Sequence, residues 1–568
     1  MLVALSFAAS TSAGSLAASP TPAPKDSPNI LLLFPDQWRY DWDGFERKNQ
    51  PDAPGALLRI PTTRSVAAAG TRFTTAYVPA PVCAPSRSCL AAGREYDEAG
   101  VLENHANDYP INQTTFYAVM RDGGYHVMTT GKDDLTKLSQ LGSKLTPKYP
   151  GCPSCVDGDG RWHQEALGFS DALRFSGKYD VISSSRTGPH EMYVCPRRSA
   201  PTLSPPSPPP LSLSLSPSLP FLRRYGYFLR NHTVRLGNGK NSTGWDAHIA
   251  CMRGGPQNHS EECANTTFTA ELYEDDFTAA KAVELLQRAP QDKPWFLHVS
   301  FPGPHDPFLV TEAMHNAASD GRVWPNATDD ASDGTPGGAC DPLAAPDGTR
   351  NRCNYAAEIE NLDRLFQVVL DEVERLDPGR KKTVVCIASD HGEMLGDHGD
   401  VDKSKPWEGS AHVPLMCSGP GIRVGATVTS PVATMDMAGT FMDYAGVKPA
   451  SGMTTLSFRP FLEGSAAAAS SAYRSFVSSG LSRFRMVVWE DPATSTQWKY
   501  ICCRGDLPNP PSTAPKPKVP GGYVEMLIDI VADPYDMHDL APTRRDVVKK
   551  LRALLPPTYA AACTALDH

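Results

Sequence analysis

The sequence lacks two features that would assign it to large classes of proteins: a long apolar run and an excess of basic residues. A membrane-spanning helix needs roughly 18 or more consecutive apolar residues, and no stretch of this chain approaches that length. Lys and Arg number 54 against 63 Asp and Glu, giving a net charge of −9 over 568 residues. This balance disfavours a protein that binds nucleic acid. We therefore expect neither a transmembrane segment nor a nucleic-acid partner.

The first residues resemble a secretion signal. An apolar run at residues 2–9 is followed by small residues through Ala18, as in the core and cleavage zone of a signal peptide. We therefore assign residues 1–18 to a signal peptide, although the basic residues that normally begin one are missing. A disordered Ala/Ser-rich tail is the alternative.

Cysteines and glycosylation sequons favour the secretory pathway, with a secreted, lysosomal or cell-surface destination. The chain has 14 cysteines, and Cys251/Cys263 and Cys340/Cys353 lie in loop-like stretches where disulfides can form. Cys152-Pro153-Ser154-Cys155 is half of a zinc pattern without a second half, so we rank zinc below disulfide bonding. Six asparagines begin N-x-S/T sequons: Asn112, Asn231, Asn241, Asn258, Asn265 and Asn326.

The composition predicts a folded protein with one large and one small unit. Hydrophobic residues make up 40% and charged residues 21%, which excludes global disorder. We place the large domain at residues 28–450 and a smaller subdomain at residues 451–568, where prolines and short strands become frequent. The Pro/Ser-rich stretch within residues 197–224 cannot join a packed core, so we expect a disordered insertion without an assigned function.

Three continuous apolar runs predict strands that are buried on both faces. They cover residues 29–34, 296–301 and 384–389, and they lead to Asp36, His305 and Asp390. Because ligands of parallel sheets bind beyond the carboxyl ends of the strands, we expect these three side chains to gather at one edge.

A helix is predicted between the last two strands, because apolar residues recur at helical spacing over residues 359–376. Pro378-Gly379 ends the pattern. Strands alternating with helices predict an α/β fold, with a large mixed, mostly parallel sheet sandwiched by helices. The C-terminal subdomain is expected to be α+β, with a short antiparallel sheet.

Residues 83–94, CAPSRSCLAAGR, resemble the signature of the sulfatase family, C-x-P-S-R followed by an apolar residue and G-R. Further motifs extend the resemblance over most of residues 28–541. The resemblance implies that a formylglycine-generating enzyme oxidises Cys83 to formylglycine, whose hydrated aldehyde is the nucleophile. One hydroxyl of this diol can attack sulfur and the other can later expel sulfate, so one hard step becomes two.

The resemblance also implies a metal site. Asp36-Gln37 and Asp390-His391 stand where the family places its two pairs of metal ligands, and the modified Cys83 adds a further ligand. These donors suit Ca²⁺, with Mg²⁺ as the alternative because one ligand is an imidazole.

Cations and a proton donor follow from further family motifs. Arg87, Lys132 and Lys403 are the candidates for stabilising charge on the sulfate group. Lys403 stands five residues before Glu408, as in the family's K-x-x-x-(aromatic)-E segment, and Lys405 is its rival. Two histidines, His305 and His398, are given different roles because their sequence contexts differ. His305 lies in a turn similar to the family's P-H-x-P-F and is the predicted general acid, whereas His398 is expected to be a structural residue or to support the site without touching the substrate.

One position departs from most of the family. Where relatives have G-K-x-H, this chain has Gly131-Lys132-Asp133-Asp134, as in the arylsulfatase K-like branch. Asp134 is therefore the predicted base that deprotonates the diol. Because a carboxyl group has a pKa near about 4, this exchange favours an acidic working pH.

These residues predict an enzyme that cleaves a sulfate monoester, with a sulfated carbohydrate as the leading substrate and an aryl ester as another. Two alternatives stay open: a phosphonate monoester or phosphodiester hydrolase of the same superfamily, and a non-catalytic protein that binds sulfated glycans. The joint presence of Cys83, the metal-binding acids and both lysines disfavours the second.

Overall fold

The computed structural model describes most of the chain outside two long internal stretches and the first 25 residues. The described residues are 26–47, 50, 53–104, 106–110, 112–135, 167–175, 233–235, 241–243, 273–306, 308, 310, 314, 317–318, 320–328, 338–339, 348–464, 473–507 and 522–564. The predicted signal peptide, the 197–224 insertion, the Cys152–Cys155 pattern, Cys251, Cys263 and Cys340 lie outside the described residues.

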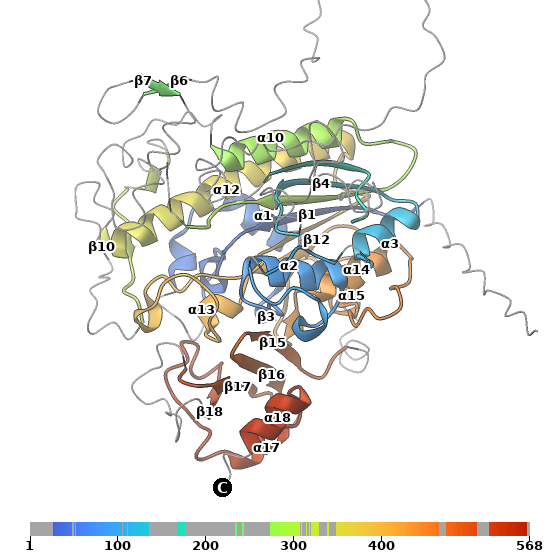
Figure 1. The fold of residues 1–568 in the computed structure, drawn as a ribbon. Coiled ribbons are helices and arrows are strands. Elements are labelled where there is room, and N and C mark those ends of the chain that lie inside the picture. The colour runs from blue at the N-terminus through green and yellow to red at the C-terminus, as the bar shows by residue number, and fades with distance from the viewer. Residues whose placement is uncertain are drawn as a thin grey trace, which may run out of the picture.

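An eight-stranded mixed sheet forms the centre of the molecule (Figure 1). Only β12 runs against its neighbours, so the sheet is mostly parallel, as the sequence predicted. The strands lie in the order β13 (Ala426–Val428), β2 (Gly70–Phe73), β12 (Leu415–Ser418), β11 (Thr383–Ala388), β1 (Asn29–Pro35), β8 (Trp295–Phe301), β4 (His126–Lys132) and β5 (Asp171–Phe175).

Helices cover both faces of this sheet (Figure 1). Side chains alternate along β1, so Leu31 and Leu33 pack into one core and Ile30, Leu32 and Phe34 into the other. The first core is completed by α1 (Pro61–Ala68), α10 (Glu274–Gln287) and α12 (Gly348–Leu376). The second is completed by α2 (Cys83–Ala92), α3 (Phe116–Asp122), α14 (Asp436–Tyr444) and α15 (Arg459–Glu463).

The three predicted strands and the predicted long helix are confirmed. Strands β1, β8 and β11 match the three apolar runs within one residue at each end. Helix α12 ends at Leu376, just before Pro378, and begins earlier than its apolar pattern. The three strands are buried on both faces, and the helix is buried along one face. Their sequence patterns were therefore clear.

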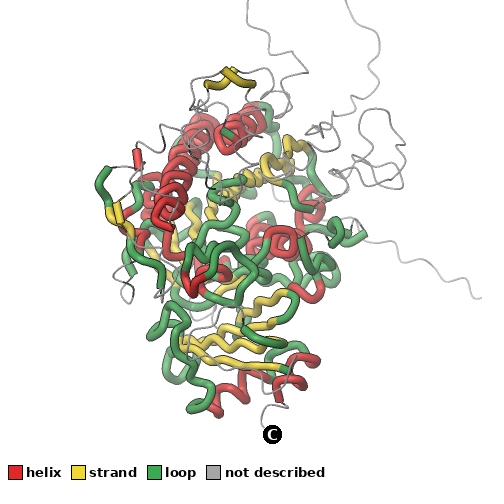
Figure 2. Tube along the Cα trace, turned by 60° about the vertical axis from the view of Figure 1, so that its left-hand side comes forward, coloured by secondary structure: helices red, strands yellow, loops and turns green. Residues whose placement is uncertain are grey.

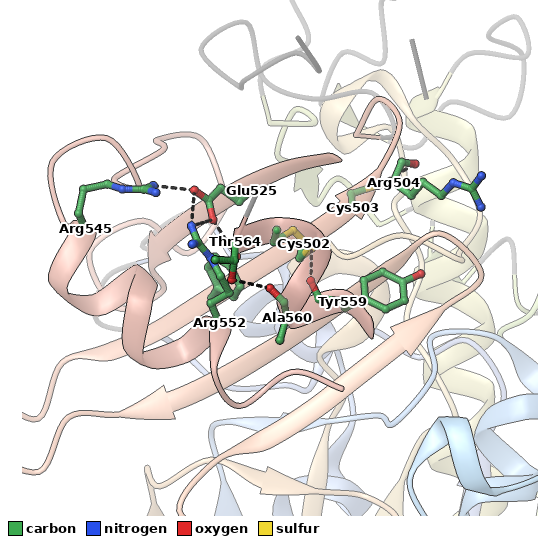
Figure 3. The surroundings of a disulfide bond; sticks show 11 residues. Cys502, Cys503, Arg504, Glu525, Arg545, Arg552, Tyr559, Ala560 and Thr564 are labelled. Atoms are coloured by element: carbon green, nitrogen blue, oxygen red, sulfur yellow. Dashed lines mark hydrogen bonds and ion pairs between the residues drawn. A yellow bond between two sulfur atoms is a disulfide. The ribbon is translucent and has the colours of Figure 1, made fainter. Parts of the chain in front are cut away.

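A four-stranded antiparallel sheet forms the C-terminal subdomain (Figure 2). Its strands are β15 (Val477–Leu481), β16 (Phe484–Glu490), β17 (Gln497–Arg504) and β18 (Tyr523–Asp529). Helices α17 (Arg545–Arg552) and α18 (Pro557–Thr564) pack on one face of this sheet, where a disulfide joins Cys502 to Cys563 (Figure 3).

The smaller elements connect these layers. Helix α13 (Glu408–Ala411) lies between the main sheet and the C-terminal sheet in the ribbon view (Figure 1). Short strand pairs are β3 (Ala76–Tyr77) with β14 (Val432–Ala433), β9 (Val323–Trp324) with β10 (Gly338–Ala339), and β6 (Thr233–Arg235) with β7 (Asn241–Thr243). Short 3-10 helices cover Tyr40–Trp42, Pro54–Leu57, Tyr96–Glu98 and Asp397–Gly399.

Disulfides and sequons can be placed in part. A second disulfide joins Cys386 of β11 to Cys417 of β12, and Cys353 is also disulfide-bonded. Asn112 and Asn326, which begin two of the sequons, are exposed. Within the described part of the chain, no helix has the length and apolar character needed to cross a membrane.

Candidate active site

The carboxyl ends of four neighbouring parallel strands bring polar side chains to one edge of the main sheet. Asp36 follows β1, Asp390 follows β11 after one residue, and Lys132 is the last residue of β4. His305 lies in the turn after β8. All four side chains are buried, so they need one another or a ligand to offset the cost of leaving water.

Cys83 reaches this edge as the first residue of α2. The side chain of Asn104 caps this helix by accepting a hydrogen bond from a first-turn amide at 2.9 Å. The helix ends at Gly93, whose φ of 57° favours glycine. The Sγ atom of Cys83 lies 3.0 Å from Nε2 of His391 and 3.8 Å from Oδ1 of Asp36. The predicted nucleophile thus lies among the predicted metal ligands.

Four of the five predicted metal ligands form one group. One donor atom from each of Asp36, Cys83, Asp390 and His391 lies within 4.8 Å of the other three. Two carboxylates and an imidazole suit a divalent cation, and a hydrated aldehyde at residue 83 would add an oxygen donor. This donor set fits the metal ion that the sequence predicts.

The fifth predicted ligand, Gln37, touches this group through its backbone. Its amide donates to Oδ1 of Asp390 at 3.1 Å, from a residue with a φ of 70°. Its side-chain oxygen accepts a hydrogen bond from Nζ of Lys403, and its amide nitrogen donates to Glu393 and Asp306. Gln37 therefore contacts the metal group with its backbone and Lys403 with its side chain, and its role as a ligand stays a prediction.

Two buried cations surround the carboxylates. Arg87 donates to Asp390 at 2.9 Å, to Asp36 at 3.0 Å and to the hydroxyl of Ser300 at 2.6 Å. Lys132 donates to Asp36 as well. Burial would raise the pKa of Asp36, but the charges of Lys132 and Arg87 hold it well below its usual range. Burial has the larger effect on Asp390, whose pKa is raised despite Arg87.

Neighbouring groups raise the pKa of the buried His391 imidazole. Burial lowers the pKa of its imidazole, but the neighbouring Asp390 and Cys83 outweigh this effect and raise the pKa to about 9. To hold a divalent ion, His391 would have to be neutral, because an imidazole binds metal in its deprotonated form. Metal binding at this group is therefore expected to release a proton.

His305 and Lys403 form a second pair on the other side of Asp36. Nζ of Lys403 lies 2.6 Å from Nε2 of His305, which lies 4.0 Å from Oδ1 of Asp36. Burial and the charge of Lys403 lower the pKa of His305 to about 3, so the neutral ring accepts a hydrogen bond from Lys403. Burial would lower the pKa of Lys403, but Cys83 and Asp306 raise it, so this side chain stays charged.

Asp134 lies in the same buried cluster as the two cations near Asp36. Its Oδ2 atom is 3.3 Å from Nζ of Lys132 and 3.7 Å from Nε of Arg87. A cavity of about 20 Å³, large enough for one water molecule, adjoins these three side chains and His298. The structure thus places the predicted base one side chain away from the metal group.

Lys405 and His398 lie apart from these contacts. The side chain of Lys405 is partly exposed and pairs with Asp400 at 2.6 Å, whereas its rival Lys403 contacts His305. The ring of His398 stacks on Trp407 with 4.8 Å between ring centroids, as expected for a structural residue.

Two acidic residues of the site, Glu393 and Asp306, were not predicted from the sequence. Both accept hydrogen bonds from the Gln37 side chain. Burial together with Asp402 and Asp306 raises the pKa of Glu393 to about 7. Their places in the sequence could have indicated them, because Asp306 directly follows His305 and Glu393 stands three residues after Asp390. Acidic residues are common in loops, however, and position alone could not separate these two from others.

A family model for sulfatases matches residues 28–447. The chain belongs to the sulfatase family. A choline-sulfatase from Rhizobium meliloti is 25% identical over 92% of this chain and 84% of its own length. Arylsulfatase K from Danio rerio is 23% identical over 93% of this chain and 83% of its own length. The resemblance stated from the motifs is confirmed, and this sulfatase is a sulfuric ester hydrolase.

Solved structures share the fold of this sulfatase. A protein from Bacteroides thetaiotaomicron, described in terms of glycosaminoglycan metabolism, superposes with a TM-score of 0.56 at 18% identity. The match covers 93% of this chain and 94% of the other. The predicted fold class is therefore confirmed, with its large sheet, its helical layers and its C-terminal antiparallel sheet.

Proposed function

We propose that this sulfatase releases sulfate from a sulfated carbohydrate, with Cys83 as formylglycine and with Ca²⁺ held by Asp36, Gln37, Asp390 and His391. The observation that carries this proposal is the position of the Cys83 Sγ atom, within 3.0 Å of His391 and 3.8 Å of Asp36. A nucleophile on that residue faces both the metal-binding group and the cations that an anionic ester requires.

The two groups that complete the site would divide the chemistry. A divalent cation supplies positive charge that attracts the sulfate group and polarises its oxygens. Formylglycine at residue 83 supplies one hydroxyl for attack on sulfur and a second for release of sulfate. Mg²⁺ is the alternative ion, because the donor set contains an imidazole.

Arg87, Lys132 and Lys403 offset negative charge around the nucleophile. All three side chains are buried, so their charges act in a medium where little water screens them. Arg87 and Lys132 hold the Asp36 carboxylate from one side, and Lys403 approaches through Gln37 and His305. We expect a bound sulfate group to lie close to these three cations.

His305 is proposed to protonate the departing alcohol. Its ring is neutral beside Lys403, but an anionic ester placed next to the ring raises its pKa by charge attraction. Nε2 of His305 accepts a hydrogen bond from Lys403, so this bond has to break before Nε2 can carry the proton. Asp134 is proposed to remove a proton from the diol in the second step, because it lies within the cluster of Lys132 and Arg87.

The substrate class is proposed from the relatives. Arylsulfatase K matches over most of both chains, and a shared-fold structure is described in terms of glycosaminoglycan metabolism. The resemblance of residues 131–134 to the arylsulfatase K-like branch implies a uronate 2-sulfate. We therefore place this sulfated sugar ahead of choline sulfate. We further propose residues 28–450 as the catalytic domain and residues 451–568 as the C-terminal subdomain.

We also propose that this sulfatase matures in the secretory pathway, where a formylglycine-generating enzyme modifies Cys83. The disulfides Cys386–Cys417 and Cys502–Cys563 suit an oxidising compartment. The exposed side chains of Asn112 and Asn326 leave two sequons accessible to glycosylation.

Mass spectrometry and a substrate comparison test this proposal together. In protein from a host with the converting enzyme, the peptide containing Cys83 should carry an aldehyde in place of the thiol. Hydrolysis of 4-nitrophenyl sulfate should exceed that of bis(4-nitrophenyl) phosphate, and sulfated uronate disaccharides should exceed choline sulfate. Unmodified Cys83 without hydrolysis would instead support a glycan-binding protein, and faster phosphodiester cleavage would support a phosphohydrolase.

A further inference from the structure

A buried charged cluster joins the C-terminal subdomain to helix α13. The side chain of Lys499, in the middle of β17, is fully buried. Its Nζ atom lies 2.8 Å from Oε1 of Glu408 and 2.6 Å from Oδ1 of Asp536. Glu408 is the first residue of α13, whereas Lys499 and Asp536 belong to the C-terminal subdomain. The cluster therefore crosses the boundary between the two units.

Hydrogen bonds hold both carboxylate oxygens and the backbone amide of Glu408. The hydroxyl of Tyr77 donates to Oε1 at 2.5 Å, and Nδ1 of His412 lies 2.7 Å from Oε2. The Glu408 amide donates to Oδ2 of Asp536 at 2.8 Å. Buried ionic groups are costly when one partner is removed, because the remaining charge is left without compensation. The cluster thus holds α13 in one position and orientation.

Side-chain alternation explains why Lys499 faces the catalytic domain. Ile501 and Cys503 of β17 pack into the core shared with the catalytic domain, whereas Tyr500 and Cys502 pack against α17 and α18. Lys499 lies two residues before Ile501, and side chains two residues apart lie on the same face of a strand. A lysine in this register points out of the small sheet toward α13.

Helix α13 in turn touches the metal-binding turn. The carbonyl oxygen of Ser410 accepts a hydrogen bond from the Gly392 amide at 2.8 Å. Gly392 directly follows His391, one of the four grouped ligands. The backbones are so close that a side chain on Gly392 would collide with the carbonyl of Gly409. A displacement of α13 therefore moves the turn that presents His391.

The same helix holds the loop that carries Lys403. The hydroxyl of Ser410 accepts a hydrogen bond from the Lys405 amide at 3.2 Å, and the Ser404 amide donates to the carbonyl of Pro81 at 2.8 Å. Asp402 and Ser404, on either side of Lys403, both have a φ of 70°. Non-glycine residues keep this conformation only where their surroundings impose it. The position of Lys403 thus depends on external contacts, including those of α13.

We propose that Lys499 and Asp536 are positioning residues of the active site: they clamp α13, and α13 sets both the His391 turn and the Lys403 loop. The C-terminal subdomain then belongs to the catalytic unit without touching the substrate through these residues. The part concerning Lys403 rests on the proposed function, whereas the part concerning His391 requires only a metal ion.

Two variants test this proposal through catalysis and through metal binding. For Lys499→Met, we expect kcat on 4-nitrophenyl sulfate to fall about tenfold or more and Ca²⁺ affinity, measured by calorimetry, to fall by a similar factor. Asp536→Asn keeps the size of the side chain and should show both losses in smaller measure. It also carries the test if Lys499→Met does not fold. All measurements are made well below the unfolding temperature of each variant.

Arg552→Met is the matched control. Arg552 is buried in the same subdomain and donates to Glu525 at 2.7 and 3.0 Å, on the face that carries α17 (Figure 3). This variant also breaks a buried ion pair, so it should lower Tm comparably, but it should leave kcat and Ca²⁺ affinity within about twofold. Wild-type values for Lys499→Met and Asp536→Asn, or equal losses in Arg552→Met, would overturn the proposal. If the wild type cleaves no sulfate ester, the proposed function fails, and Ca²⁺ affinity still decides the role of the clamp.

Discussion

Gly392 and Gly409 are in direct backbone contact: a Cβ atom on Gly392 would stand 2.0 Å from the carbonyl oxygen of Gly409. This contact joins the turn that carries His391 to helix α13. Only glycine fits at residue 392, because the neighbouring atom is part of the backbone and cannot rotate away. The metal-binding turn therefore requires a glycine at residue 392 as well as its charged groups.

Gly392→Ala should destabilise the protein by about 1–3 kcal/mol, as overpacking does in other buried sites. The added methyl group has to push α13 away from the turn. Gly409→Ala is the control, since its Cβ would meet Nη1 of Arg39 and the carbonyl oxygen of Glu393 at 3.2 Å, which small shifts can relieve. Urea unfolding of the two variants checks this prediction, and equal losses in both would contradict it.

Lys403 and Lys405 can be separated by a pair of substitutions. Lys403→Met should lower kcat/KM by about 10²–10³-fold, because it removes a buried cation that contacts His305 and Gln37. Lys405→Met should change kcat/KM by less than about twofold, since its partly exposed side chain pairs with Asp400 at the surface of the site. Steady-state kinetics on 4-nitrophenyl sulfate measures both. A larger loss for Lys405→Met would transfer the catalytic role to that residue.

Asp134 should set the acidic limb of the pH profile. Asp134→Asn should lower kcat by about 10²–10⁴-fold, the usual contribution of a general base. Asp134→His should keep part of the activity and move the acidic limb toward neutral pH, because imidazole has a pKa of about 6.5 and a carboxyl about 4. The measurement is kcat against pH for the wild type and both variants. A limb that stays in place in Asp134→His would show that another group acts as the base.

Asp536 should make the protein less stable as pH rises toward neutrality. Burial raises its pKa to about 7 despite Lys499, whereas an unfolded Asp titrates near about 3.9. Between these values the folded state binds more protons, so the free energy of unfolding falls as pH rises. Glu408 has the opposite effect below about pH 4. Lys499 and His412 outweigh burial and lower its pKa, so protonation of Glu408 lowers the free energy of unfolding as the pH falls.

Asp536→Asn should therefore flatten the decline in unfolding free energy between about pH 4 and 7. Urea unfolding at several pH values measures the slope. Asp546→Asn serves as the control because this carboxylate is largely exposed on α17, and it should keep the wild-type slope. An unchanged slope in Asp536→Asn would show that the Asp536 carboxyl is ionised throughout this range in the folded protein.

The sequence predicted the elements that are buried on both faces and the residues that follow them. Strands β1, β8 and β11 were visible because their apolar runs are continuous, and Asp36 and Asp390 because they end such runs. Strands β2 and β13, at one end of the main sheet, were missed, since they are only three or four residues long and carry no periodic pattern. Short strands owe their position to neighbours that are distant in sequence.

The site was predicted as a set of residues but not as a set of contacts. The motifs named Lys403 and His305, yet their direct hydrogen bond depends on two loops about a hundred residues apart. The clamp around Glu408 was missed as well. Its signal was Lys499, a lysine in the middle of a mostly apolar strand, but the partners of such a residue become visible only after the chain has folded.

The position of β1 in the main sheet constrains how the chain can fold during synthesis. This strand is made first, but its two neighbours, β8 and β11, begin at Trp295 and Thr383. Until the ribosome has released Ala388, one edge of an apolar strand stays open to other chains. A nascent sulfatase of this type should therefore depend on chaperones for most of its translation, and shortened transcripts that stop before β11 should give aggregates rather than partly active enzyme.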